Sequence, residues 1–280
     1  MKSFYTSLII LLITLFIGTS LSFGLDAVDY YNAAQQAHYV HDNYKEALSD
    51  IDKSIELDPS NSLYYHERGV IKLDMKSYTS AIVDFDNSIE LSSPKSAASS
   101  YSYRGDAKKE LKDYTGAIAD YDKAIELEPE FASTLNNRGL VKSYLKDYSG
   151  AIADYDKAIK TAPKYATAYF NRGVAKYYLK DYSGAIADYD KAIEVEPKYT
   201  SAYFNRGIAK YYLKDYTGAI VDYDKTIKLS PKHASAYFNR GVAKENLEDK
   251  VGAIADYTKA IELNPDNENF KANLKRIQKE

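Results

Sequence analysis

Apolar residues recur along the chain with helical spacing, in segments separated by short polar breaks. Residues 167–180 and 184–196 each present one apolar face, which predicts a pair of amphipathic α-helices. Residues 181–183 predict the turn between them, with Ser183 as the N-cap of the second helix. Pro197 cannot continue a helix and therefore predicts its end. The pattern indicates a helix–turn–helix unit.

This unit recurs with a period of 34 residues. The sequence from Ala151 to Ile159 returns unchanged from Ala185 to Ile193, and near copies begin at Ala117, Ala219 and Ala253. Prolines close the successive units at Pro59, Pro94, Pro129, Pro163, Pro197, Pro231 and Pro265. A period of this length is typical of repeat proteins, and the prolines predict seven repeats.

The residue order within each unit resembles that of the tetratricopeptide repeat (TPR) family. The residues that match the family's Trp, Gly, Ala, Phe and Pro positions are Tyr169, Gly173, Ala185, Tyr189 and Pro197. Arg172 and Lys176 depart from the pattern, because they replace Leu and Tyr. The resemblance implies an all-α fold, a TPR solenoid in which helix-turn-helix repeats form a right-handed superhelix.

We expect the repeats to span residues 28–265 and a C-terminal capping helix to follow over residues 266–280. The apolar residues at helical spacing in that last segment are Phe270, Leu274 and Ile277. The other residues of the segment are mostly charged or amides, as expected for a helix that closes a solenoid with a polar outer face.

Gly173 lies inside the first predicted helix of its repeat, where glycine costs about 1 kcal/mol relative to alanine. Glycine recurs at this position in six repeats. This predicts a close helix–helix approach, with the small Ala185 and Ala192 on the facing helix. We expect the core of the repeat to consist of Tyr169, Gly173, Leu179, Ala185, Ile186, Tyr189, Ala192 and Ile193.

Composition narrows the classes of function. The chain is 45% hydrophobic and 28% charged, as expected for a folded protein. Its 37 basic and 40 acidic residues leave no basic excess for nucleic acid. Cysteine is absent and the four histidines are scattered, so we expect neither a metal site nor a cofactor. No nucleophile–base pair, P-loop or dinucleotide motif indicates an enzyme, and we predict no catalytic residues.

The first residues predict an export signal. Lys2 precedes an apolar stretch over residues 8–17, and the small residues 18–22 follow. This order is typical of a secretory signal peptide, and we interpret residues 1–22 as one, cleaved after Ser22. The alternative is an uncleaved membrane anchor. Both interpretations place the protein outside the cytoplasm, in the periplasm or cell envelope.

The TPR resemblance implies a concave surface lined by the first helix of each repeat. In the later repeats this surface carries a second apolar stripe beyond the predicted core. Contiguous exposed apolar surface indicates an interaction site, and tyrosine offers large contact area at low entropic cost. The candidate groove residues are Tyr144, Phe170, Asn171, Val174, Tyr177, Tyr178, Phe204, Asn205, Ile208, Tyr211, Tyr212, Phe238, Asn239 and Val242. The alternative is that the aromatic side chains are partly buried between adjacent helices.

The groove also contains a ladder of asparagines at one repeat position, Asn137, Asn171, Asn205 and Asn239. In chaperone-cofactor TPR proteins such an asparagine belongs to a clamp for a C-terminal carboxylate, but the accompanying lysines are missing here. Two interpretations stay open. The amides either bind the main chain of an extended peptide or bond local groups.

Arginines and aspartates also recur once per repeat. The arginines precede the helix glycine, at Arg68, Arg104, Arg138, Arg172, Arg206 and Arg240. The aspartates lie in the second helix, at Asp50, Asp84, Asp120, Asp154, Asp188, Asp222 and Asp256. Repeat 1 has the aspartate but no arginine. We therefore expect each arginine to pair with the aspartate of the preceding repeat, such as Arg206 with Asp188, rather than to form a track for an acidic ligand.

These observations predict an exported scaffold or adaptor. It would hold an extended peptide or a helix of an envelope protein in a tyrosine-rich concave groove. The alternatives are a structural solenoid that self-associates into a homo-oligomer, and a glycan-binding module that uses the same aromatic face. We expect a protein or peptide partner, no nucleic acid, and membrane contact only through the N-terminal segment if it is uncleaved.

Overall fold

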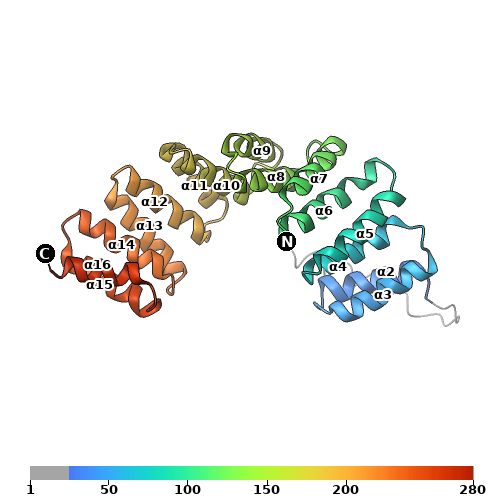
Figure 1. Ribbon diagram of the computed structural model, residues 1–280, viewed down its shortest axis with the longest axis horizontal. Coiled ribbons are helices and arrows are strands. Elements are labelled where there is room, and N and C mark those ends of the chain that lie inside the picture. The colour runs from blue at the N-terminus through green and yellow to red at the C-terminus, as the bar shows by residue number, and fades with distance from the viewer. Residues whose placement is uncertain (1–24, 280) are drawn as a thin grey trace. The chain divides into compact units, whose positions relative to one another are not determined.

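A computed structural model describes residues 25–279 and is drawn in Figure 1. The segment predicted as a signal peptide lies outside these residues. Within them the ordered elements are all helices, which confirms the prediction of an all-α TPR solenoid with a C-terminal capping helix. The helices are α2 (Ala27–Tyr39), α3 (Tyr44–Leu57), α4 (Ser62–Asp74), α5 (Tyr78–Leu91), the 3-10 helix η1 (Lys95–Ala97), α6 (Ala98–Glu110), α7 (Tyr114–Leu127), α8 (Ala132–Tyr144), α9 (Tyr148–Thr161), α10 (Ala166–Tyr178), α11 (Tyr182–Val195), α12 (Thr200–Tyr212), α13 (Tyr216–Leu229), α14 (Ala234–Asn246), α15 (Lys250–Leu263) and α16 (Glu268–Ile277).

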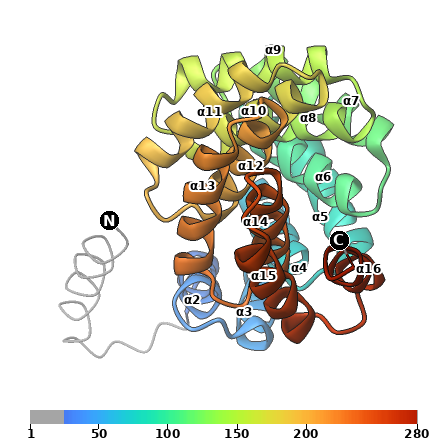
Figure 2. The same ribbon diagram turned by 90° about the vertical axis from the view of Figure 1, so that its left-hand side faces the viewer.

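The helices form two compact units, one up to Leu91 and one from Ser92 onward. The first contains the pairs α2–α3 and α4–α5, and the second contains the pairs from α6–α7 to α14–α15, followed by α16. We number the pairs as repeats 1 to 7 in chain order. Inside each unit, the two helices of a repeat pack together, and the second helix packs against the first helix of the next repeat. Figure 2 shows α14 and α15 side by side in this way.

The turn inside repeat 5 differs from its prediction in detail. Lys180 has a positive φ of 62°, and this left-handed residue separates α10 from α11. The N-cap of α11 is Asp181, whose carboxylate accepts a hydrogen bond from the amide of Gly184 at 2.9 Å. The prediction of Ser183 as the cap was wrong, because α11 begins before that residue. An aspartate after a left-handed lysine is therefore the helix-start signal in this repeat.

Most of the predicted core of repeat 5 is confirmed. Ala185, Tyr189 and Ala192 are fully buried, while Tyr169, Ile186 and Ile193 are partly buried. The inclusion of Leu179 was wrong, because this residue is the C-cap of α10 and is 49% exposed. Small residues that the prediction missed, Ala168 and Ala175, are buried instead. The packed face of α10 is thus built largely from alanine and glycine.

The helix glycine faces an aromatic ring. A Cβ atom added at Gly173 would lie 2.7 Å from Cε1 of Tyr189 and 3.2 Å from the carbonyl oxygen of Ala185. The predicted close approach is present, but the tyrosine ring makes its tightest contact. Equivalent glycines face the rings of Phe85, Tyr121, Tyr155, Tyr223 and Tyr257. Each repeat from 2 to 7 therefore packs a large aromatic ring against a stretch of backbone that has no side chain.

Candidate functional site

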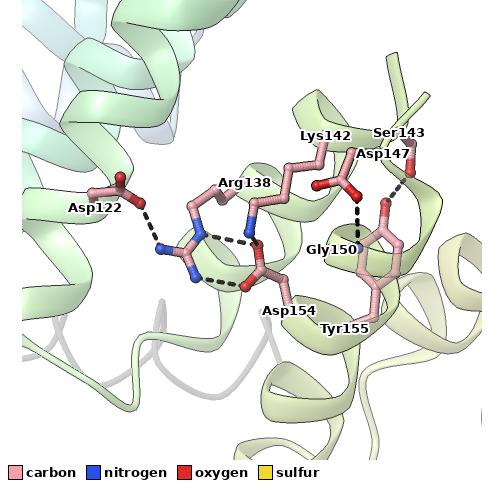
Figure 3. A network of polar contacts seen from close by, with 8 residues as sticks. All are labelled: Asp122, Arg138, Lys142, Ser143, Asp147, Gly150, Asp154 and Tyr155. Carbon is pink, nitrogen blue, oxygen red and sulfur yellow. Dashed lines mark hydrogen bonds and ion pairs between the residues drawn. The ribbon is translucent and has the colours of Figure 1, made fainter. Parts of the chain in front are cut away.

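A network of ion pairs runs from a buried aspartate of repeat 4 through Arg138 to an exposed aspartate of repeat 3, as Figure 3 shows. Arg138 donates through Nε to Asp154 at 2.9 Å and through Nη1 to Asp122 at 2.6 Å. Lys142 lies 2.8 Å from the second carboxylate oxygen of Asp154. The Asp154 side chain is 3% exposed, and the guanidinium of Arg138 and the ammonium of Lys142 balance its burial.

The partner predicted for each arginine was wrong. Arg206 forms its two-pronged contact with Asp222 of its own repeat, not with Asp188. From the preceding repeat it contacts Asp190, two residues further along the same helix. Burial alone would lower the pKa of Arg206, but the hydrogen bonds that it donates to both aspartates raise its pKa above the ordinary value. The structural interpretation of the arginines is supported, since their donors are occupied within the fold.

Two cavities open between first helices of the second unit. The 4/5 cavity, of about 330 Å³, is lined by Leu140, Ser143, Tyr144, Lys146, Tyr148, Tyr155, Asn171, Val174, Ala175 and Tyr178. The 6/7 cavity, of about 300 Å³, is lined by Tyr177, Ile208, Tyr211, Tyr212, Tyr223, Asn239 and Val242. Both have walls of aromatic and aliphatic side chains and a few hydroxyl and amide groups. Most of the predicted groove residues thus lie around these two hollows.

The three phenylalanines predicted for the groove lie outside both cavities. Phe170 packs at 5.0 Å from Tyr199, measured between ring centroids, and Phe204 packs at 4.6 Å from His233. Phe238 stacks on Phe270 of the capping helix at 4.6 Å. Each phenylalanine therefore fills the space between one repeat and the next element. At these positions the structure matches the alternative of partial burial.

The tyrosines at the ends of the first helices are the exposed members of the groove. Tyr178 is 58% exposed and Tyr212 is 53% exposed. One face of each ring is covered by the preceding repeat, since Tyr178 stacks on Tyr148 at 5.1 Å and Tyr212 stacks on Tyr182 at 5.0 Å. Each ring also has an edge-to-face contact with Tyr177. The tyrosines that begin the second helices were not among the predicted groove residues, although their recurrence in repeats 1 to 6 was a usable signal.

The asparagine ladder bonds local groups. Asn171 donates to Oδ1 of Asn136 at 3.0 Å, and Asn205 donates to the carbonyl oxygen of Ser201 at 2.8 Å. Asn239 donates to the hydroxyl of Tyr223, one of the bonds that hold this buried tyrosine in place. Asn171 and Asn239 also line the two cavities. Their amides are thus held by the fold at the surface of the groove.

Other kinds of site find no support in residues 25–279. This part of the chain contains no group of histidine, aspartate and glutamate side chains that could hold a metal ion. None of its helices has the length and apolar character needed to cross a membrane.

The fold and its repeated Gly–Tyr contact define a helical repeat protein, and comparison with known families identifies its class. The family model described as "Tetratricopeptide repeat" matches residues 166–199 and 234–267. The family model described as "TPR repeat" matches residues 105–143, 144–180 and 207–247. The chain belongs to the TPR family. This family serves generally as a non-enzymatic scaffold for protein–protein interactions, and its members bind protein or peptide partners.

Solved structures resemble the chain over most of their own length. A crystal structure of MamA is 28% identical with a TM-score of 0.56, and the match covers 59% of this chain and 91% of that one. A TPR protein from Parabacteroides merdae is 19% identical with a TM-score of 0.63, covering 91% of this chain and 100% of that one. The C-terminal part of a TPR protein from Cytophaga hutchinsonii is 20% identical with a TM-score of 0.69, covering 87% and 99%. The last two show the fold alone. A search of curated proteins returned no match.

Proposed function

We propose that this protein is an exported scaffold that holds an extended peptide, or a helix of an envelope protein, in the groove of repeats 4 to 7. The observation that carries this proposal is the pair of cavities with exposed tyrosines at their rims. Apolar walls with a small number of fixed polar groups are typical of binding sites. Tyrosines that are already stacked on a neighbour lose little conformational entropy when a partner covers their exposed part.

The arginines contribute little to partner selection in this proposal. Their guanidinium groups are bound within the fold, so a partner gains no strong contact by being acidic. Self-association and glycan binding would use the same tyrosines. Photo-cross-linking from Tyr178 and Tyr212 separates these occupants from a peptide.

A photo-reactive amino acid at Tyr178 or Tyr212 is expected to cross-link one protein partner in intact cells. The matched control is the same group at Val221, which is 60% exposed and lines neither cavity. Mass spectrometry identifies the product. Cross-links at the tyrosines that contain only this chain would indicate self-association, and equal labelling at Val221 would remove the support for the groove.

The purified partner then tests the energetics. Tyr178→Ala with Tyr212→Ala is expected to weaken binding at least tenfold, because central aromatic contacts dominate interface energies. The unfolding free energy should fall by only about 1–2 kcal/mol, since both side chains are more than half exposed and lose mainly their stacks on Tyr148 and Tyr182. Tyr203→Ala with Tyr237→Ala is the control for lost tyrosine area, as these rings lie under Arg206 and Arg240 outside the cavities. Calorimetry measures the affinity of each variant for the partner. If the control variant binds as weakly as the test variant, the result would argue against the groove.

We also propose that residues 1–22 direct export and are removed. The proposal is supported by the order of Lys2, the apolar stretch and the small residues before Ser22. N-terminal sequencing of the protein from the envelope fraction should begin at Phe23. A chain that retains Met1 in the membrane fraction would favour the uncleaved anchor, and recovery from the cytoplasm would contradict export.

A further inference from the structure

The 4/5 and 6/7 cavities are two copies of one site. Every lining residue of the 6/7 cavity except Tyr177 has the same repeat position as a lining residue of the 4/5 cavity, two repeats earlier. Among these pairs are Tyr155 with Tyr223, Asn171 with Asn239, and Val174 with Val242. The volumes also agree, at about 330 and 300 Å³. A chemical group that fits one cavity therefore meets nearly the same surface in the other.

Two sequence positions explain why these junctions have cavities. At the junction of repeats 5 and 6 both positions are tyrosines, Tyr177 and Tyr212, whose rings meet edge to face with centroids 5.7 Å apart. At the junction of repeats 4 and 5 the first position is Ser143. At the junction of repeats 6 and 7 the second position is Asn246. A small side chain thus replaces one ring at each cavity, whereas a pair of rings lies at the junction between them.

The 4/5 cavity contains an amide whose orientation is fixed. A carboxylate only accepts hydrogen bonds, so Asn137 turns its amide nitrogen to Asp106, at 2.9 Å. The oxygen of Asn137 then accepts from Asn136 at 3.2 Å, and the oxygen of Asn136 accepts from Asn171 at 3.0 Å. This chain turns the nitrogen of Asn171 into the fold. Its oxygen accepts no hydrogen bond from residues 25–279 and is available to an occupant of the cavity.

The 6/7 cavity repeats this chemistry. The amide nitrogen of Asn239 donates to the hydroxyl of Tyr223, which leaves the amide oxygen as an acceptor. The walls of both cavities are aromatic and aliphatic, and each includes a half-exposed tyrosine, Tyr144 at 54% or Tyr212 at 53%. An aromatic side chain with a hydrogen-bond donor matches such a site, because the N–H of tryptophan and the hydroxyl of tyrosine need a partner when buried.

We propose that the groove binds a peptide through two aromatic side chains of the same kind, tryptophan or tyrosine, one in each cavity. This inference rests on the proposed peptide-binding groove and names the feature that the partner must carry. Each ring packs on the walls of its cavity and donates a hydrogen bond to the oxygen of Asn171 or Asn239. The peptide between the two rings crosses the junction of repeats 5 and 6.

The size of the cavities explains why two rings are needed. A volume of about 300 Å³ is at the lower end of the range for ligand sites, so each cavity holds one side chain. One such contact binds weakly by itself. Two contacts on one peptide reinforce each other, because the second ring binds at the high effective concentration that the first one creates.

Bivalent peptides test whether the cavities act as a pair. The probes are fluorescein-labelled peptides with two tryptophans, joined by glycine–serine spacers of roughly 4 to 24 residues. Affinity, measured by fluorescence anisotropy, should pass through a maximum at one spacer length. There it should exceed the affinity of a one-tryptophan peptide by about tenfold or more. Affinity that does not depend on spacer length would overturn the inference, while a partner captured by photo-cross-linking at Tyr178 would still support the groove.

Phenylalanine peptides test the hydrogen bond to the asparagines. The series with two phenylalanines should bind about fivefold more weakly at the best spacer length, since this ring has no donor for the amide oxygens. Equal affinity of the two series would overturn the assignment of tryptophan or tyrosine as the occupant.

Filling one cavity at a time tests where the rings bind. Ser143→Tyr brings to the 4/5 junction the two tyrosines of the 5/6 junction, and Asn246→Tyr, at an exposed site, does the same at the 6/7 junction. Each variant should lower the affinity of the best two-tryptophan peptide to that of the one-tryptophan peptide and remove the dependence on spacer length. Ser183→Tyr is the matched control, because it adds the same side chain at an exposed site outside both cavities. Wild-type binding by both filled variants would overturn the inference.

Discussion

Arg206→Met is expected to lower the unfolding free energy of the second unit by about 3 kcal/mol. The Asp222 side chain is 1% exposed and would retain only Lys210, at 2.8 Å, as a cationic partner. Removing one member of a buried pair typically costs about 3–5 kcal/mol, and the remaining lysine places the result at the lower end. Urea denaturation of the purified protein measures the change.

A double-mutant cycle identifies the partner. Arg206→Met and Asp222→Asn should couple by about 1–3 kcal/mol, so that the double variant costs less than the sum of the singles. Asp190 is 54% exposed, and its coupling to Arg206 should be below about 1 kcal/mol. If the cycle with Asp222 shows no coupling and Arg206→Met instead causes a salt-sensitive loss of partner binding, the arginines form a ligand track.

Gly173→Leu is expected to destabilise the second unit by about 3 kcal/mol. Even the Cβ atom would lie 2.7 Å from the ring of Tyr189, and the rest of the leucine side chain has no space. Overpacking of this kind usually costs about 1–3 kcal/mol, and the backbone of α11 limits relaxation here. Thermal unfolding monitored by circular dichroism provides the measurement.

Two further variants establish the cause of that loss. Tyr189→Ala removes the opposing ring, so Gly173→Leu should cost clearly less in that background than in the wild type. Ala187→Leu, at an exposed site of α11, should change stability by less than about 0.5 kcal/mol. Full tolerance of leucine at position 173 would contradict the close contact between helix and ring.

The helix pairs could be predicted because their determinants are local and repeated. A glycine, an aromatic residue and a proline recur at the positions of Gly173, Tyr189 and Pro197 in repeats 2 to 7, so each of these repeats supplies the same evidence for the same unit. The arginine partners could not be predicted in this way. Asp188 and Asp190 lie two residues apart on one helix and differ only in the direction they face. Which of them meets Arg206 depends on how successive helices pack.

The groove could be predicted only as a stripe of apolar side chains. Its division into buried phenylalanines and exposed tyrosines depends on contacts between repeats, such as the stack of Tyr178 on Tyr148. The buried hydroxyl of Tyr189 has no partner among residues 25–279, and this could not be predicted from the sequence. Asn205, which could have reached this hydroxyl, donates instead to the carbonyl oxygen of Ser201, and spacing alone does not predict such a contact.

The arginine that binds one aspartate of its own repeat and one of the repeat before it makes the junctions interchangeable. Arg138, Arg172, Arg206 and Arg240 all use this pair of contacts. A copy of one whole repeat inserted at such a junction would bring the exposed aspartate that the arginine of its successor contacts, and the arginine that the exposed aspartate of its predecessor contacts. Because the buried aspartate lies in the same repeat as its arginine, gene duplication in steps of whole repeats would lengthen this protein and keep both contacts of each arginine, whereas insertion of part of a repeat would separate an arginine from the exposed aspartate of the repeat before it.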